Sequence, residues 1–254
     1  MGETHRKVDF LPALGRRLIE LQKEDFNKCI KHYRELEIDE DSIAGHNKDL
    51  LRRAHKIAFT MGLFVQKLSA VPPWVSPYLN CLKSDTIQII PSIVLGNRRS
   101  LHLYERASIE DFLRYIYYFD HRIEHILLQN HPTKFQSLDS LIGWIKSYPS
   151  LIPYKKLVAQ SCNNLTSRYG ELSRTVHGTT IADIEPSDNL KALHKPLESP
   201  LTEMRTLKSI FKSIIFLLSL FHLEEFRAFS LDEKVLICQH LVKKEKQVLS
   251  GVEA

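Results

Sequence analysis

The sequence predicts an all-α fold, and three observations support this prediction. Glycine, which weakens helices, accounts for only 9 of the 254 residues. Leu and Ile recur three and four residues apart among Lys, Glu and Arg, the pattern of helices with one apolar face. The alternation of apolar and polar residues that is typical of strands is hard to find. We therefore expect a helical bundle with additional N-terminal helices.

The N-terminal part predicts two amphipathic helices, over 11–36 and about 49–68, which together form an N-terminal helical region, 1–70. Pro72, Pro73 and Pro77 then interrupt any helix and mark a boundary, so we assign 71–98 to a proline-containing connection. Within it, 85–96 is rich in β-branched residues. Its periodicity does not distinguish a short strand from a helix or a packed loop.

Residues 99–250 predict the main bundle. One helix runs over about 99–129, a second follows the cap Ser137 and ends near Pro149, and a third runs from Ser150 to His177, where Gly178 ends it. A polar connection, 179–200, leads to an apolar helix over about 201–229. Ser230 caps the last helix, 231–249.

Composition restricts where the chain works. The longest apolar run, 214–221, is too short to span a bilayer and is flanked by charges, so it predicts the central buried helix and no membrane partner. The four cysteines form no Cys-x-x-Cys pair, and the N-terminus lacks the apolar core of a signal peptide. We expect a reduced, cytoplasmic compartment. The net charge of +5 permits an anionic partner such as nucleic acid.

The predicted helix over 104–128 divides into an apolar and a charged side. The apolar side, expected to face the core, carries Ile109, Phe112, Leu113, Ile116, Phe119, Ile123, Ile126 and Leu127. Within an arc of roughly 100° opposite it lie Arg106, Glu110, Arg114, Tyr117, His121, Glu124 and His125. Arginine binds phosphate oxygens, histidine exchanges protons near neutral pH, and a carboxylate can orient the arginines. This side could therefore handle a phosphodiester.

Two other interpretations of the same side remain open. Arg106, Glu110 and Arg114 are also spaced as ordinary ion pairs of a solvated helix. His121, Glu124 and His125 match the H-x-x-E-H pattern of inverted zinc peptidases, but the sequence indicates no third protein ligand. We expect neither a metal nor a cofactor.

The end of the helix before Gly178 carries the second candidate motif. Residues 172–178, LSRTVHG, place Arg174 and His177 in its last turn. This segment resembles the terminal motif of HEPN domains, compact helical bundles that are often RNases of toxin, CRISPR and antiviral systems. The resemblance covers about 99–178. It implies a homodimeric, metal-independent endoribonuclease of a microbial defence or toxin module, with RNA or a nucleotide as ligand and a partner protein of that system.

The motif departs from the family pattern at one position. His177 and Ser173 match it, but Leu172 stands where the family most often has its arginine, and Arg174 is only three residues from His177. The family spacing occurs elsewhere between Arg114 and His121. We therefore expect a site built from two helices, with His177 as general acid or base, Arg106 and Arg114 on the phosphate, and Glu110 orienting them. Arg174 and His121 are further candidates.

Other functions are compatible with the same residues. A HEPN-like bundle that has lost hydrolysis could bind RNA or a nucleotide, or serve as a dimerisation module that regulates a partner. A helical scaffold could bind a partner protein through its N-terminal helices. His177 itself could serve only the helix end, where the helix dipole favours a protonated imidazole.

Overall fold

The computed structural model describes residues 11–35, 47–131, 133, 135–178 and 197–251. In this part of the chain it contains eleven α-helices and one 3-10 helix, and no strand, which confirms the all-α prediction. The elements are α1 (Leu11–Glu35), α2 (Lys48–Lys67), α3 (Ser76–Val94), α4 (Arg98–Asp120), α5 (Arg122–Asn130), α6 (Leu138–Ser147), η2 (Pro149–Tyr154), α7 (Lys155–His177), α8 (Pro200–Phe221), α9 (Leu223–Ala228), α10 (Leu231–Cys238) and α11 (Lys243–Ser250).

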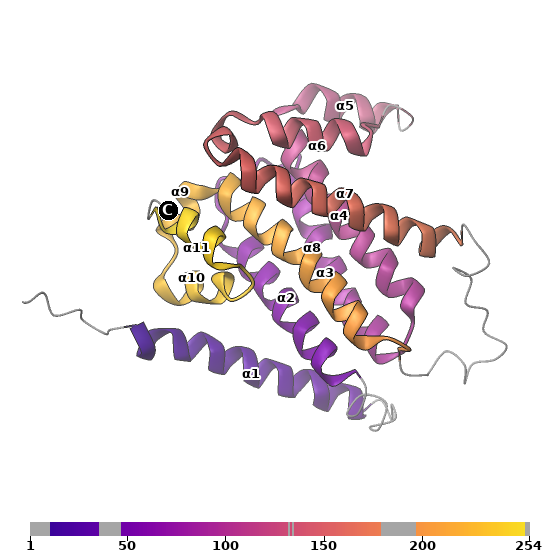
Figure 1. Cartoon of the computed structure of the whole chain (residues 1–254), viewed down its shortest axis with the longest axis vertical. Helices are drawn as coiled ribbons and strands as arrows, with labels where there is room; N and C mark the ends of the chain where they lie inside the picture. The colour runs from indigo at the N-terminus through magenta and orange to yellow at the C-terminus, as the bar shows by residue number, and fades with distance from the viewer. Residues whose placement is uncertain (1–10, 36–46, 132, 134, 179–196, 252–254) are drawn as a thin grey trace, which may run out of the picture.

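Helix α8 forms the centre of the molecule, as its apolar sequence predicts. It packs against α2, α4 and α7, and α3 packs against both α2 and α4 (Figure 1). Phe211, Ile214 and Leu218 on α8 are completely buried. Burying an apolar side chain of this size stabilises the fold by about 1.5–3 kcal/mol. The buried side chains of α2, α3, α4, α7 and α8 belong to a single core.

The boundary signals in the sequence have the expected effects in several places. Ser137 accepts a hydrogen bond from the Ser140 amide, and Ser230 forms a capping box with Glu233. Gly178 ends α7 with φ of 57°, a left-handed conformation that glycine adopts without strain. Residues 85–96, which periodicity left open, are largely the second half of α3, and most of the expected connection 71–98 is thus helical.

The long helix expected over 99–129 is broken at His121. The Tyr117 carbonyl accepts a hydrogen bond from His121 Nδ1, and the Tyr118 carbonyl accepts one from Trp74 Nε1. Side chains therefore occupy carbonyls that a continuous helix would use. Beyond residue 120 the prediction of a core-facing apolar side is wrong. Ile123, Ile126 and Leu127 lie on α5, after the break, and are 73%, 48% and 43% exposed.

Two other predicted helices are also divided. The helix expected over 201–229 ends at Phe221, because the buried His222 ring bonds both the Tyr115 hydroxyl and the Glu225 carboxylate. The helix expected over 231–249 becomes α10 and α11, separated by a turn in which the His240 amide donates to the Ile237 carbonyl. The buried His240 ring contacts the Thr60 hydroxyl at 2.9 Å, so a polar contact of a buried histidine accompanies both breaks, and helical periodicity does not register such contacts.

A buried polar cluster joins α4 to α8. Glu203 on α8 accepts hydrogen bonds from Arg98 Nε at 2.9 Å and His102 Nε2 at 2.7 Å. Burial opposes the charge of Glu203, but the bonds from His102 and Arg98 lower its pKa overall. Complete burial and the nearby Glu203 raise the pKa of Glu105 well above its usual range. This cluster fixes the first turns of α4.

No helix among the described residues has the length and apolar character needed to cross a membrane. The N-terminal residues used for the compartment prediction, and 179–196 of the predicted polar connection, lie outside the described part of the chain.

Candidate functional site

The N-terminal half of α4 and the C-terminal end of α7 lie side by side (Figure 1). The guanidinium of Arg99 on α4 donates to the Val176 carbonyl of α7 from Nε at 3.1 Å and from Nη2 at 2.9 Å. This contact uses a carbonyl that the end of α7 leaves without a helical partner. It holds the last turn of α7, with His177, beside α4.

Arg106 connects the two helices. Its Nη1 donates to His177 Nε2 over 2.9 Å, and its Nη2 donates to the Tyr169 hydroxyl, also over 2.9 Å. Because arginine has no acceptor, His177 must accept at Nε2, so its imidazole is neutral in this arrangement. The Arg106 guanidinium also lies 5.0 Å from the centre of the Tyr169 ring. The two-helix arrangement thus places an arginine directly against the exposed histidine.

Glu110 joins both arginines. Its Oε1 lies 3.0 Å from Arg106 Nη2, its Oε2 lies 3.1 Å from Arg114 Nη2, and the Tyr169 hydroxyl donates to its Oε1 over 2.8 Å. The side chains of Arg106, Glu110 and Arg114 are 21%, 23% and 37% exposed, so solvent or a ligand reaches each of them. We call Arg106, Glu110, Arg114, Tyr169 and His177 the α4–α7 cluster.

A pair of acidic side chains lies next to this cluster. Asp111 on α4 is 3.9 Å from Arg114 Nη1 and close to Asp85 on α3. Burial and then the Asp111 carboxyl raise the pKa of Asp85 to about 7. Burial also raises the pKa of Asp111, which Arg114 partly offsets. The pair therefore holds a proton near neutral pH.

A shallow cavity of about 270 Å³ opens beside the cluster. Arg106, Glu110, Arg114 and Tyr169 form one side of it, and the start of α6 with the preceding residues forms the other. Phe135 lines its edge and is 68% exposed. An exposed aromatic ring beside arginines provides a surface on which a base can stack.

The remaining predicted site residues lie apart from the cluster. Arg174 is exposed on α7 and makes no described contact with Arg106 or His177. His121 stacks on Tyr117 with ring centres 4.0 Å apart and meets the edge of Trp144. His125 packs against Tyr78 and Tyr118. The predicted charged side thus separates at the break before α5, and only its first three members join His177.

The zinc motif does not gain a third ligand. Among the described residues, no three His, Cys, Asp or Glu side chains gather closely enough to hold a metal ion. His121 also uses Nδ1 for a bond to the Tyr117 carbonyl.

Sequence reasoning missed three contributors to the site. Tyr169 fits the apolar spacing of α7, and only its hydroxyl distinguishes it from a core residue. Asp85 lies in a helix that the pattern left unassigned, so its meeting with Asp111 had no sequence signal. Phe135 lies between α5 and α6, where no periodicity applies.

No protein-family model matches the sequence, and neither a curated protein nor a solved structure matches it.

Proposed function

We propose that the chain is a metal-independent endoribonuclease of HEPN type whose active site is the α4–α7 cluster. The observation that carries the proposal is the 2.9 Å contact between Arg106 Nη1 and His177 Nε2 across two helices. In this proposal Arg106 on α4 takes the place of the family arginine, a position that Leu172 occupies on α7. A homodimer acting in a microbial antiviral defence or toxin module is part of the proposal and rests on the family resemblance alone.

The chemistry follows from the groups present. Arg106 and Arg114 turn their donors to the non-bridging oxygens of a phosphodiester, which frees the Nε2 lone pair of His177. His177 takes the proton of the ribose 2′-hydroxyl, whose oxygen attacks phosphorus. The bond from phosphorus to the 5′-oxygen breaks, and that oxygen takes a proton from water. The hydroxide that remains takes the proton from His177 and restores the neutral base. The products are a 2′,3′-cyclic phosphate and a 5′-hydroxyl, with Glu110 orienting both arginines throughout.

A second candidate is a binding module without hydrolysis. It is favoured by Leu172, which is 1% exposed and faces the core, so the position of the family arginine offers nothing to a ligand. In that case the α4–α7 cluster holds RNA and does not turn it over.

The test is RNA cleavage by the purified protein in EDTA. We expect wild type to cleave and His177→Ala to lose at least about 100-fold in rate, as for a general base. Arg174→Ala is the matched control, since it removes a side chain from the same turn of α7 outside the cluster. A stable RNA complex with no cleavage by wild type would select the binding module. Equal losses in both variants would refute the assignment of His177.

A further inference from the structure

A second cavity, of about 510 Å³, lies between α1 and α2. Its described lining residues lie within 22–30 of α1 and 48–56 of α2, and none of them belongs to the α4–α7 cluster. The volume falls within the range of about 300–1,000 Å³ that is common for small-molecule sites. It is large enough for a ligand well beyond a single inorganic ion.

Positive charge surrounds this cavity. Lys23, Lys48, Arg52 and Lys56 line it, and no carboxylate is among the lining residues that the structure describes. Asp49 pairs with Arg52 at 3.0 Å, on an outer edge where the Asp49 side chain is 81% exposed. Burial and then the neighbouring Arg53, Arg52 and Lys23 lower the pKa of Lys56. The cations therefore repel one another, and a bound anion would relieve that repulsion.

Buried polar atoms at the cavity also lack partners. Gln22 is 3% exposed and His55 is 4% exposed. Gln22 Nε2 and His55 Nδ1 have no hydrogen bond within the described part of the chain. His55 Nε2 lies 3.0 Å from the Asp25 carboxylate, and burial lowers the pKa of His55, so the neutral ring donates at Nε2 and offers Nδ1 as an acceptor. Leaving such buried atoms unpaired destabilises the fold, so a ligand that bonds them is favoured.

The other described lining residues are Phe26, Asn27 and Ile30, and two of them provide an apolar wall. Phe26 and Ile30 line the cavity, Phe26 packs edge-on against His55, and the Arg52 guanidinium lies 5.8 Å from the Phe26 ring centre. A ligand that uses the whole site therefore needs negative charge, an apolar body, a hydrogen-bond acceptor for Gln22 and a donor for His55.

We propose that this cavity binds a phosphate ester of nucleotide size. The phosphates contact Lys23, Lys48, Arg52 and Lys56, while the organic part lies against Phe26 and Ile30 and bonds Gln22 and His55. The proposal is independent of RNA cleavage at the α4–α7 cluster.

Calorimetric titration of the full chain with ATP tests this proposal, with pyrophosphate and adenosine as the separate halves of that probe. We expect ATP to bind more tightly than pyrophosphate, and adenosine to bind weakest, because both parts of the site contribute. The double variant Arg52→Gln/Lys56→Gln should weaken ATP binding at least about 10-fold. Both side chains reach solvent, and a thermal melt checks that the variant is folded.

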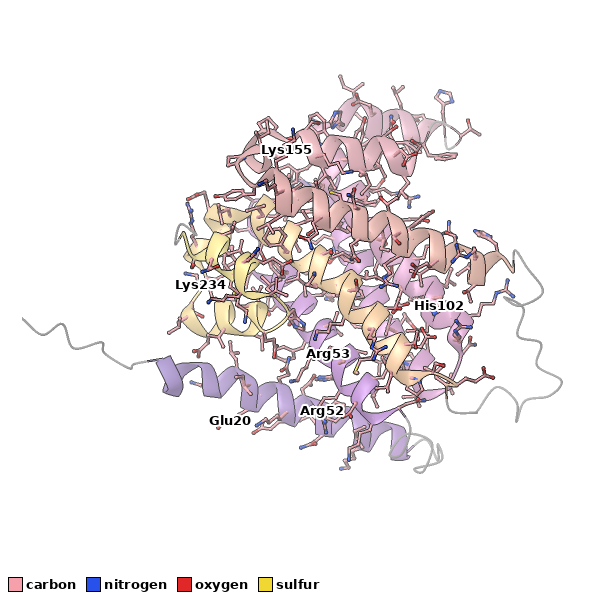
Figure 2. The ribbon with its side chains drawn as sticks, viewed as in Figure 1. Glu20, Arg52, Arg53, His102, Lys155 and Lys234 are labelled. Atoms are coloured by element: carbon pink, nitrogen blue, oxygen red, sulfur yellow. The ribbon has the colours of Figure 1, made fainter. Side chains whose placement is uncertain are left out.

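The matched control is Lys155→Gln/Lys156→Gln, which removes the same charge from exposed positions at the start of α7. Figure 2 places Lys155 at the opposite end of the molecule from Arg52 and Arg53. This control and His177→Ala should bind ATP as wild type does. Absence of ATP binding up to about 1 mM, equal weakening in both double variants, or pyrophosphate binding as tight as ATP would overturn the proposal.

Discussion

Arg106 is the residue on which the proposed chemistry depends. Its guanidinium donates to His177 and Tyr169, and Glu110 lies 3.0 Å from Nη2, so the guanidinium is held in position without a ligand. Pre-organised donors of this kind stabilise developing charge without reorganising during the reaction. The resting contact also directs the Arg106 donor at Nε2 of His177, the atom that would act as general base.

The Tyr169 hydroxyl should matter for rate more than for folding. In Tyr169→Phe the ring still packs beneath Arg106, but the hydroxyl bonds to Arg106 and Glu110 are lost. We expect RNA cleavage to slow by about 5–30-fold, since one or both of two bonds are removed from the transition state and each is worth roughly 1 kcal/mol. Tyr104→Phe, which removes a tyrosine hydroxyl from α4 outside the cluster, is the control. Unchanged cleavage by Tyr169→Phe would show that the hydroxyl does not position Arg106.

At the scale of elements, two carboxyl groups at the contact of α3 with α4 hold a proton near neutral pH. Asp85 and Asp111 face each other between these helices, and both have raised pKa values in the folded state. The folded protein therefore binds more protons than the unfolded chain between the ordinary aspartate pKa of about 3.9 and the folded value for Asp85 of about 7. Stability from this pair is fully present below that window and is lost as the pH rises through it.

Replacing Asp85 should remove part of this pH dependence. We expect Asp85→Asn to raise the melting temperature relative to wild type at pH 8 but not at pH 4. A difference of about 2–4 °C corresponds to roughly 1 kcal/mol for a chain of this size. The control is Asp139→Asn, at an exposed position of α6, which should change the melting temperature by the same amount at pH 4 and at pH 8. A shift of the same size at pH 4 and pH 8 in Asp85→Asn would contradict the raised pKa of Asp85.

At the scale of the whole molecule, local signals predicted the elements better than their junctions. The all-α class, the central helix α8, the caps Ser137 and Ser230 and the stop at Gly178 follow from spacing and end chemistry. The breaks at His121 and His222 do not, because they accompany contacts with side chains far along the chain, such as Trp74 and Tyr115. Tertiary contacts of this kind override helical periodicity.

The candidate site shows the same division. Arg106, Glu110 and Arg114 share one side of α4 by spacing alone, so their grouping was predictable. The approach of His177 was an expectation that the contact at 2.9 Å now supports. The separation of His121 and the roles of Tyr169 and Asp85 depend on how α3, α5 and α7 pack, which no local pattern encodes.

The central claim is that Arg106 and His177 act as one site, and a double-mutant cycle on RNA cleavage in EDTA tests it most directly. Initial rates would be measured for wild type, Arg106→Ala, His177→Ala and the double variant. We predict that each single change costs at least about 100-fold and that the double variant is no slower than the slower single variant. Losses that multiply in the double variant, or full cleavage by Arg106→Ala, would contradict the claim.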